Sequence, residues 1–97
     1  MSSQRQQLWI VAYDTPSSRR RRKLATLLEG YGQRVQWSVF ECDLEANQFK
    51  QLHQRLCRLV APEEDSVRLW PITERSRTQM IHVGRTIIRT EWQDRLI

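Results

Sequence analysis

The first hydrophobic segment of the chain is continuous rather than alternating. Every residue from Leu8 to Tyr13 is apolar or aromatic. A strand with one face in water alternates polar and apolar residues, whereas an unbroken run indicates a central strand covered on both faces. A chain of 97 residues can cover only one of these faces with its own helices. We therefore predict that a partner subunit covers the second face of the sheet. The simplest such assembly is a homodimer.

Two later segments have the spacing of amphipathic helices. The first helix can be capped by Ser17 or Ser18, and Gly30 and Gly32 supply its stop. The second ends before Pro62, because the residue preceding a proline is pushed out of the helical region. The apolar positions that recur at helical intervals are Leu24, Leu27, Leu28 and Tyr31 in the first segment and Phe49, Leu52, Leu56, Leu59 and Val60 in the second.

Alternation between apolar and polar residues predicts β structure from Arg34 to Glu41. The pattern fits either one bent strand or a tight hairpin, with Val35, Trp37 and Val39 on one face. Trp37 and Phe40 would then point to opposite faces. We expect one of these two aromatic side chains in the core, which leaves the other as a candidate for stacking on a nucleic-acid base.

A further strand is predicted at Val67–Trp70, with Pro71 at its end or at a sheet edge. A short strand near residues 80–83 is expected to follow. The order strand, helix, strand, strand, helix, strand predicts an α+β, ferredoxin-like βαββαβ domain, with an antiparallel sheet and two helices on one face. The chain then divides into a polar N-terminal extension at 1–7, the domain at 8–84 and a C-terminal tail at 85–97.

Charge points to an anionic partner. The net charge is +5, the pI is about 10.0, and arginine far outnumbers lysine, which favours phosphate recognition by planar bidentate donors. Five cations in succession, residues 19–23, open the first predicted helix, where positive charge opposes the helix dipole. We therefore expect an anion at this surface, and we take nucleic acid as the candidate ligand of Arg19, Arg20, Arg21 and Arg22.

Other features limit the classes of protein that fit. No apolar stretch reaches the length of a transmembrane helix, and the polar start does not have the pattern of a signal peptide. Cys42 and Cys57 lack the spacing of a zinc site, so we interpret them as reduced thiols of a cytoplasmic protein.

One carboxylate, Asp14, follows the first strand directly and lies five residues before the arginine block. A polyanion bound by the arginines would lie close to this carboxylate, which could hold a divalent cation such as Mg²⁺. The alternative is that Asp14 only caps the following helix. Glu41 and Asp43 could supplement it, although carboxylates on strands near basic residues more often form surface ion pairs.

These segments together resemble a known family. The strand that ends in Tyr13-Asp14, the basic helix at 19–28 and the run from Tyr31 to Glu41 are similar to motifs of the small CRISPR-associated endonucleases of spacer acquisition, the Cas2 family. The third segment matches the signature G-x-R-V-Q-x-S-V-F, and the similarity covers about residues 8–84 with Val67–Ile72 included. The longer N-terminal extension and the tail after Gly84 do not match the family.

The resemblance implies a homodimer in which an extra C-terminal strand lies against the partner's sheet. It also implies a magnesium-dependent nuclease centre at the dimer interface and association with the CRISPR integrase. Asp14 matches the metal-binding and catalytic aspartate of the family. Tyr13, Arg21, Arg34 and Phe40 match positions that the family associates with the site or with nucleic acid: we take Tyr13 as catalytic, and Arg34 and Phe40 as nucleic-acid ligands.

In a symmetric dimer one Asp14 per chain becomes a pair, which could hold Mg²⁺ for hydrolysis of a phosphodiester bond. A catalytically silent subunit that bridges DNA in the integrase complex would share the fold, the charge and Asp14, so it stays open as an alternative. An RNA-recognition module of similar topology is disfavoured because its aromatic strand motif is absent. Whether the substrate is RNA or double-stranded DNA is left open by the sequence.

Overall fold

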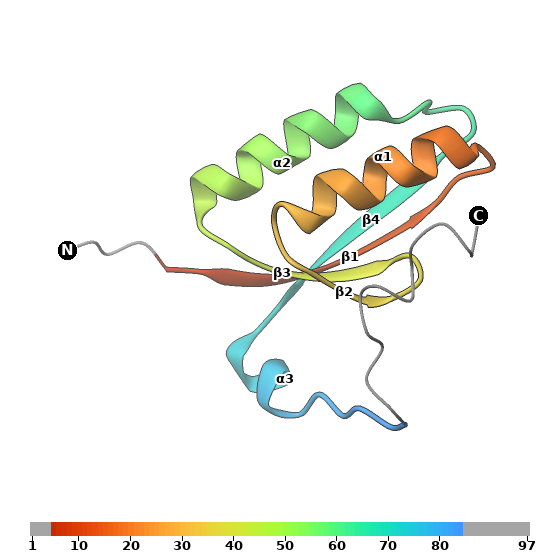
Figure 1. The fold of residues 1–97 in the computed structure, drawn as a ribbon. Helices are drawn as coiled ribbons and strands as arrows, with labels where there is room; N and C mark the ends of the chain where they lie inside the picture. Colours follow the sequence, from red (N-terminus) through yellow and green to blue (C-terminus); the bar gives the residue numbers. More distant parts are fainter. Residues whose placement is uncertain (1–4, 85–97) are drawn as a thin grey trace.

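The computed structural model describes residues 5–84, which form a four-stranded antiparallel sheet covered on one face by two helices (Figure 1). The sheet order is β2-β3-β1-β4. This arrangement confirms the α+β class and is compatible with the ferredoxin-like topology. The elements are β1 (Gln7–Asp14), α1 (Ser18–Glu29), β2 (Gln33–Gln36), β3 (Val39–Leu44), α2 (Ala46–Leu59), β4 (Ser66–Ile72) and α3 (Glu74–Thr78).

Strand β1 is central, as its continuous apolar run predicts. It pairs with β3 on one side and β4 on the other, and Val11 lies opposite Phe40 and Leu69. The side chains of β1 that face the helices pack into a core with α1 and α2. Fully buried members of this core include Val11, Leu24, Leu28, Phe40 and Leu52.

The structure confirms the predicted Ser17 cap and Gly30 stop of α1 and the end of α2 before Pro62. The hydroxyl of Ser17 accepts a hydrogen bond from the Arg20 backbone N–H at 3.1 Å and caps α1, and Gly30 is its C-terminal cap. Asp14 is therefore not the cap of this helix. At the start of α2 the Gln48 side chain accepts a bond from the Glu45 N–H at 2.8 Å. These caps satisfy backbone groups that a helix end leaves unpaired.

The segment after α1 is a hairpin and not a bent strand. Strands β2 and β3 are joined by a turn at Trp37 and Ser38, and their register shifts between Arg34 and Gln36. Arg34 lies opposite Phe40, so both face the helices. The prediction that Trp37 is a strand residue is wrong, because the chain reverses at this position.

The end of the domain also differs from the prediction. Residues 80–83 form no strand, and the short helix α3 precedes them, capped by the Thr73 hydroxyl, which accepts a bond from the Ser76 N–H at 3.0 Å. Pro71 lies inside β4, which is an edge strand of the sheet, as one alternative expected. An edge position tolerates a residue without an N–H donor.

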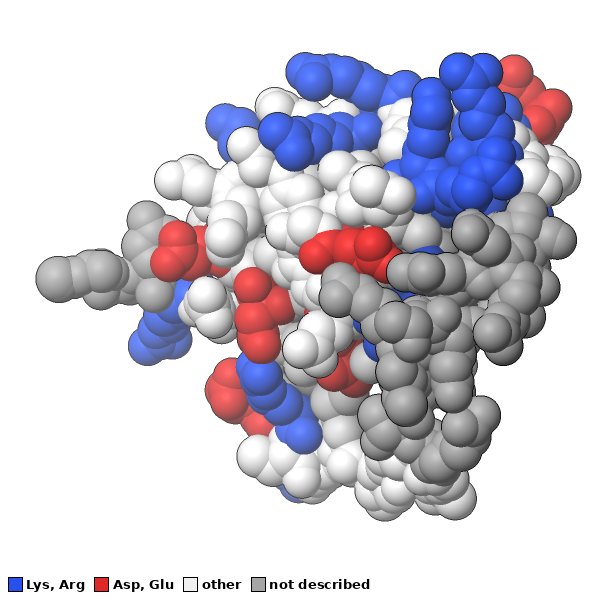
Figure 2. Space-filling view, viewed as in Figure 1, with Lys and Arg blue, Asp and Glu red and all other residues white. Residues whose placement is uncertain are grey.

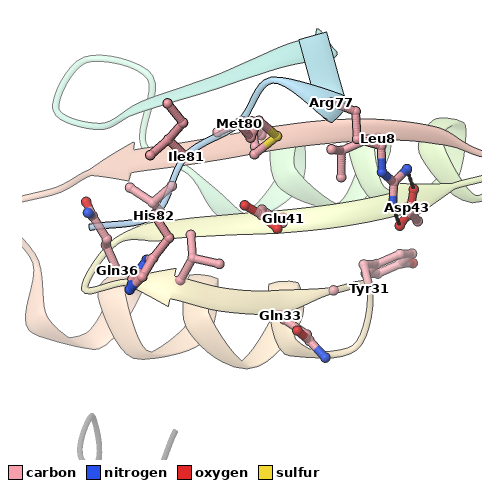
Figure 3. Close-up of a pocket in the computed structure, with 14 residues that line it drawn as sticks. Leu8, Tyr31, Gln33, Gln36, Glu41, Asp43, Arg77, Met80, Ile81 and His82 are labelled. Carbon is pink, nitrogen blue, oxygen red and sulfur yellow. Dashed lines mark hydrogen bonds and ion pairs between the residues drawn. The ribbon is translucent and has the colours of Figure 1, made fainter. Parts of the chain in front are cut away.

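The segment after α3 runs along the sheet face that carries neither α1 nor α2. With the sheet it lines a hollow of about 840 Å³, to which Leu8, Arg77, Met80 and Ile81 contribute (Figure 3). Large apolar side chains stay exposed among the described residues, including Trp70 at 43% and Ile81 at 86%. The homodimer stays a prediction, and the predicted C-terminal strand in the tail lies outside the described residues.

None of the helices within residues 5–84 combines the length and the apolar character that crossing a membrane requires.

Candidate functional site

Asp14 lines a cavity of about 300 Å³ at the end of β1. The cavity is formed by three segments: the end of β1, the start of α1, and the turn between β2 and β3. Asp14, Tyr13 and Arg21, which the sequence singles out, are thus brought together. The complete lining is Tyr13, Asp14, Thr15, Ser18, Arg21, Trp37 and Ser38.

Tyr13 connects this cavity to the core. Its side chain is 6% exposed, its ring centroid lies 6.3 Å from that of Phe40, and its backbone N–H donates to the Ser38 carbonyl at 3.1 Å. Burial raises the pKa of the Tyr13 phenol, and the Arg34 and Arg21 guanidiniums offset part of this rise. The phenol therefore remains protonated at neutral pH and can donate a hydrogen bond.

Arg34 lies among aromatic rings on the helix side of the hairpin. Its guanidinium carbon is 5.3 Å from the centroid of Phe40 and 5.7 Å from that of Trp37, within the range of cation–π contacts. Phe40 itself is fully buried, at 0% exposed. Its prediction as a nucleic-acid ligand is wrong for the folded chain, because no base can reach a ring enclosed in the core.

The arginine block divides into residues with different surroundings. The Arg20 Nε donates to Asp65 at 2.6 Å and its terminal nitrogen to Glu64 at 2.5 Å, so Arg20 forms a structural ion pair, and its contact with nucleic acid stays a prediction. Arg21 donates to the Thr15 carbonyl at 2.9 Å and lines the Asp14 cavity. Arg19 and Arg22 are exposed on the outer surface of α1.

Figure 2 shows Lys and Arg gathered over the two helices, with a dense group where α1 begins. On α1, the side chains of Arg19, Arg22 and Lys23 line a shallow groove with Leu27, and Leu59 of α2 completes it. Exposed cations of α2 extend this surface at Lys50, Arg55 and Arg58. The helix layer is therefore the basic side of the described domain.

Asp65, which the sequence analysis did not single out, joins the loop after β1 to the loop before β4. Its side chain is fully buried, and it accepts bonds from the Thr15 hydroxyl at 2.6 Å, the Arg20 Nε at 2.6 Å and the Ala61 N–H at 2.8 Å. Thr15 directly follows Asp14, so Asp65 fixes the backbone beside the candidate site. Asp65 and Glu64 also supply negative charge at the start of α1, where the first turn has no acidic residue.

The Asp65 contacts predict a pH-dependent contribution to stability. The Arg20 hydrogen bond, followed by those of Thr15 and Ala61, holds the pKa of Asp65 well below its usual range. Because the pKa is lowered by folding, this contribution is fully present above the ordinary Asp pKa of about 4 and is lost as the pH falls toward the lowered value. We expect Asp65→Asn to lower Tm by on the order of 5–10 °C at neutral pH.

Thermal melts of the wild type and Asp65→Asn at about pH 7 and about pH 3 check this expectation, and the difference in Tm should shrink in acid. Glu64→Gln is a matched control, because it removes the exposed partner of the same arginine and should cost little. Equal Tm losses for the two variants would contradict the buried role of Asp65.

The other candidate carboxylates do not reach Asp14 within one chain. Glu41 lies opposite Ile10 and Asp43 opposite Leu8, toward the far end of β1. Asp43 accepts two bonds from Arg77, at 2.7 and 2.8 Å, and these bonds lower its pKa (Figure 3). The ion-pair alternative is therefore confirmed for Asp43. Within residues 5–84 no group of three or more His, Cys, Asp or Glu side chains converges as a metal site.

Comparisons with known proteins agree with this architecture. A family model described as "CRISPR associated protein Cas2" matches residues 7–80. The chain is 52% identical over 73 residues to "CRISPR-associated endoribonuclease Cas2 3" of Synechocystis sp., covering 75% of this chain and 79% of the relative.

Two solved structures are similar in fold. The crystal structure of Streptococcus pyogenes Cas2 at pH 6.5 has a TM-score of 0.72 and 30% identity, over 79% of this chain and 99% of that one. A chain of a partial Cas6-RT-Cas1–Cas2 complex has a TM-score of 0.71 and 26% identity, over 79% of this chain and 90% of that one.

Proposed function

Because the chain belongs to the CRISPR-associated protein Cas2 family, we propose that it is a metal-dependent endonuclease of spacer acquisition that hydrolyses phosphodiester bonds in nucleic acid. The observation that carries this proposal is that Asp14 and Arg21 line the same cavity. A carboxylate and a guanidinium in one cavity can hold a cation and a phosphate side by side. The similarity to a relative named as an endoribonuclease supports the same activity.

The donor set of the cavity fits Mg²⁺. The Asp14 carboxylate is exposed and supplies a hard oxygen ligand, and magnesium commonly keeps several waters and binds through one or two carboxylates. When bound, this ion would supply charge stabilisation and an activated water for phosphodiester hydrolysis. A symmetric homodimer would bring a second Asp14 to the site, and we propose this assembly.

Arg21 is the proposed phosphate ligand of the substrate, and Tyr13 and Asp65 support the site. The Arg21 guanidinium donates hydrogen bonds to the Thr15 carbonyl at 2.9 Å and to the Ser18 hydroxyl at 3.4 Å. Because a guanidinium has five N–H donors, its other donors can bind a phosphate oxygen. Tyr13 lines the same cavity and keeps a protonated phenol. Asp65 holds the Thr15 hydroxyl and thereby sets the position of the neighbouring Asp14 backbone.

The exposed cations of α1 are proposed to bind the phosphate backbone of the nucleic acid. We expect Arg22→Gln to reduce the slope of log affinity against log salt concentration by about 0.7 for a single strand or about 0.9 for a duplex. Arg20→Gln is the matched control, since Arg20 is held by Asp65 and Glu64 and should change stability more than this slope. Binding titrations at several salt concentrations measure both variants, and equal slopes for Arg22→Gln and the wild type would refute this role.

A second candidate function is a catalytically silent subunit that bridges DNA in an integrase complex. The observation that favours it is the single acidic side chain, Asp14, in the lining of the cavity. Similarity to a chain of a Cas1–Cas2 complex supports an integrase subunit as partner under either function. Since both functions act on nucleic acid inside the cell, we propose a cytoplasmic location.

One experiment separates the two functions. Labelled single-stranded RNA and double-stranded DNA are incubated with the purified protein in Mg²⁺ or in EDTA, and binding is followed in the same samples. The nuclease function predicts cleavage in Mg²⁺ and none in EDTA, and the substrate that is cut identifies the specificity. Binding of duplex DNA without any cleavage would overturn the nuclease function in favour of the bridging subunit.

A further inference from the structure

The turn between β2 and β3 contains a tryptophan, Trp37, followed by Ser38. Turns favour Gly, Pro, Asn, Asp and Ser, because these residues tolerate or stabilise the turn backbone. A large aromatic side chain does not stabilise the turn backbone in this way. We therefore ask which contacts the Trp37 side chain makes. Trp37 is only partly buried, and it lines the same cavity as Asp14.

Three contacts hold this turn beside the candidate site. The Tyr13 N–H donates to the Ser38 carbonyl at 3.1 Å and ties the turn to the end of β1. The Arg34 guanidinium carbon lies 5.7 Å from the centroid of the Trp37 ring. The same guanidinium lies 5.3 Å from buried Phe40, which anchors it to the core. The indole is therefore a supported surface in the wall of the cavity.

The other described tryptophans are placed differently. Trp9 stacks on Phe49 with ring centroids 4.1 Å apart and packs against the core. Trp70 lies opposite Ile10 on β1. Neither Trp9 nor Trp70 lines the Asp14 cavity. Phe40 is enclosed in the core. Among the described tryptophans, Trp37 thus lines one cavity with Asp14 and Arg21, and Tyr13 is the other aromatic residue in that lining.

We propose that the Trp37 indole is a stacking surface for one unpaired base next to the phosphate bound by Arg21, so that the site takes a single-stranded segment. This inference rests on the proposed nucleic-acid function and specifies its substrate class. A volume of about 300 Å³ is at the small end for ligand sites and can take one nucleotide rather than a base-paired helix. Stacking tolerates any base, because every base has a π face.

The test measures binding rather than cleavage. Affinities for a single-stranded oligonucleotide, and for the same oligonucleotide with abasic positions, are measured in EDTA for the wild type, Trp37→Phe, Trp37→Leu and Trp37→Ala. Phenylalanine keeps a π face, whereas leucine keeps apolar bulk without one. Thermal melts of all four proteins establish that the variants fold, and a duplex of the same sequence is the competing ligand.

We expect Trp37→Ala and Trp37→Leu to weaken binding of the intact single strand by roughly 5- to 150-fold, and Trp37→Phe to retain most of the affinity. The abasic strand should bind weakly to all four proteins with little difference among them. Equal losses for intact and abasic strands, full affinity in Trp37→Leu, or no single-strand binding by the wild type would overturn the proposal. Because EDTA excludes metal-dependent cleavage, Trp37-dependent binding by a protein that never cleaves would support stacking while refuting the nuclease function.

Discussion

Replacement of Asp14 by alanine is expected to abolish metal-dependent cleavage, with a loss of at least about 100-fold in rate. The reason is that Asp14 is the acidic residue in the lining of the cavity, so its removal leaves a cation there without a carboxylate ligand from the chain. Stability should change little, because Asp14 is exposed and Ser17, not Asp14, caps α1. Cleavage assays over a range of Mg²⁺ concentrations, with thermal melts of the same samples, measure both effects.

Asp43→Asn is a matched control for this experiment. It removes a carboxylate from the same sheet, but that carboxylate pairs with Arg77 near the far end of β1. Its cleavage rate should stay close to that of the wild type. Full activity in Asp14→Ala would show that the metal is held elsewhere, and equal losses in the two variants would point to a general effect of charge.

Replacement of Gly32 by alanine is expected to destabilise the domain by roughly 3 kcal/mol. A Cβ at this position would lie 2.2 Å from the Glu41 carbonyl oxygen and 2.6 Å from the Cys42 Sγ, far inside contact distance. The obstacle is the backbone of β3 and a fully buried thiol, so relief requires a shift of β2 away from the sheet. Urea denaturation, monitored by tryptophan fluorescence, measures the free energy of unfolding of the wild type and the variant.

Gly30→Ala is the control for Gly32→Ala. Gly30 has φ −76° in the helical region, and an added Cβ would meet the Leu27 carbonyl at 3.3 Å. This change should alter stability by less than about 1 kcal/mol in either direction. If the two variants lose the same stability, the requirement for glycine at position 32 is not steric. The close approach of the Gly32 backbone to β3 also explains why the first residue of the signature segment that ends in Phe40 is a glycine.

The fold was largely predictable because its patterns are local. The unbroken apolar run of β1 marks a central strand, the apolar spacing with capping signals marks α1, and the apolar spacing before Pro62 marks the body and end of α2. The turn at Trp37 was not predictable, since the alternation continues through it and tertiary pairing with β3 decides where the chain reverses. The helix α3 was missed because it buries no side chain and therefore has no apolar periodicity.

The site was predictable only where its residues are neighbours in sequence. Tyr13, Asp14 and Arg21 gather because a strand end and the next helix start always lie close together. Asp65 and Trp37 come from other segments, and no local pattern reports the hydrogen bond between Thr15 and Asp65, which are 50 positions apart. Likewise, a run of identical arginines does not reveal which member is held by a buried carboxylate.

The bridge from Asp65 to Thr15 and Arg20 has a consequence for the newly made chain. During synthesis, Asp14 and the arginine block emerge well before Asp65, since domains are produced from the N-terminus at about 5–20 residues per second. The loop beside Asp14 gains its anchor only when Asp65 arrives and β4 pairs with β1. A nascent chain that ends before Asp65 would therefore display the cations without a finished cavity, so competence to act on nucleic acid should arise only once β4 has been made.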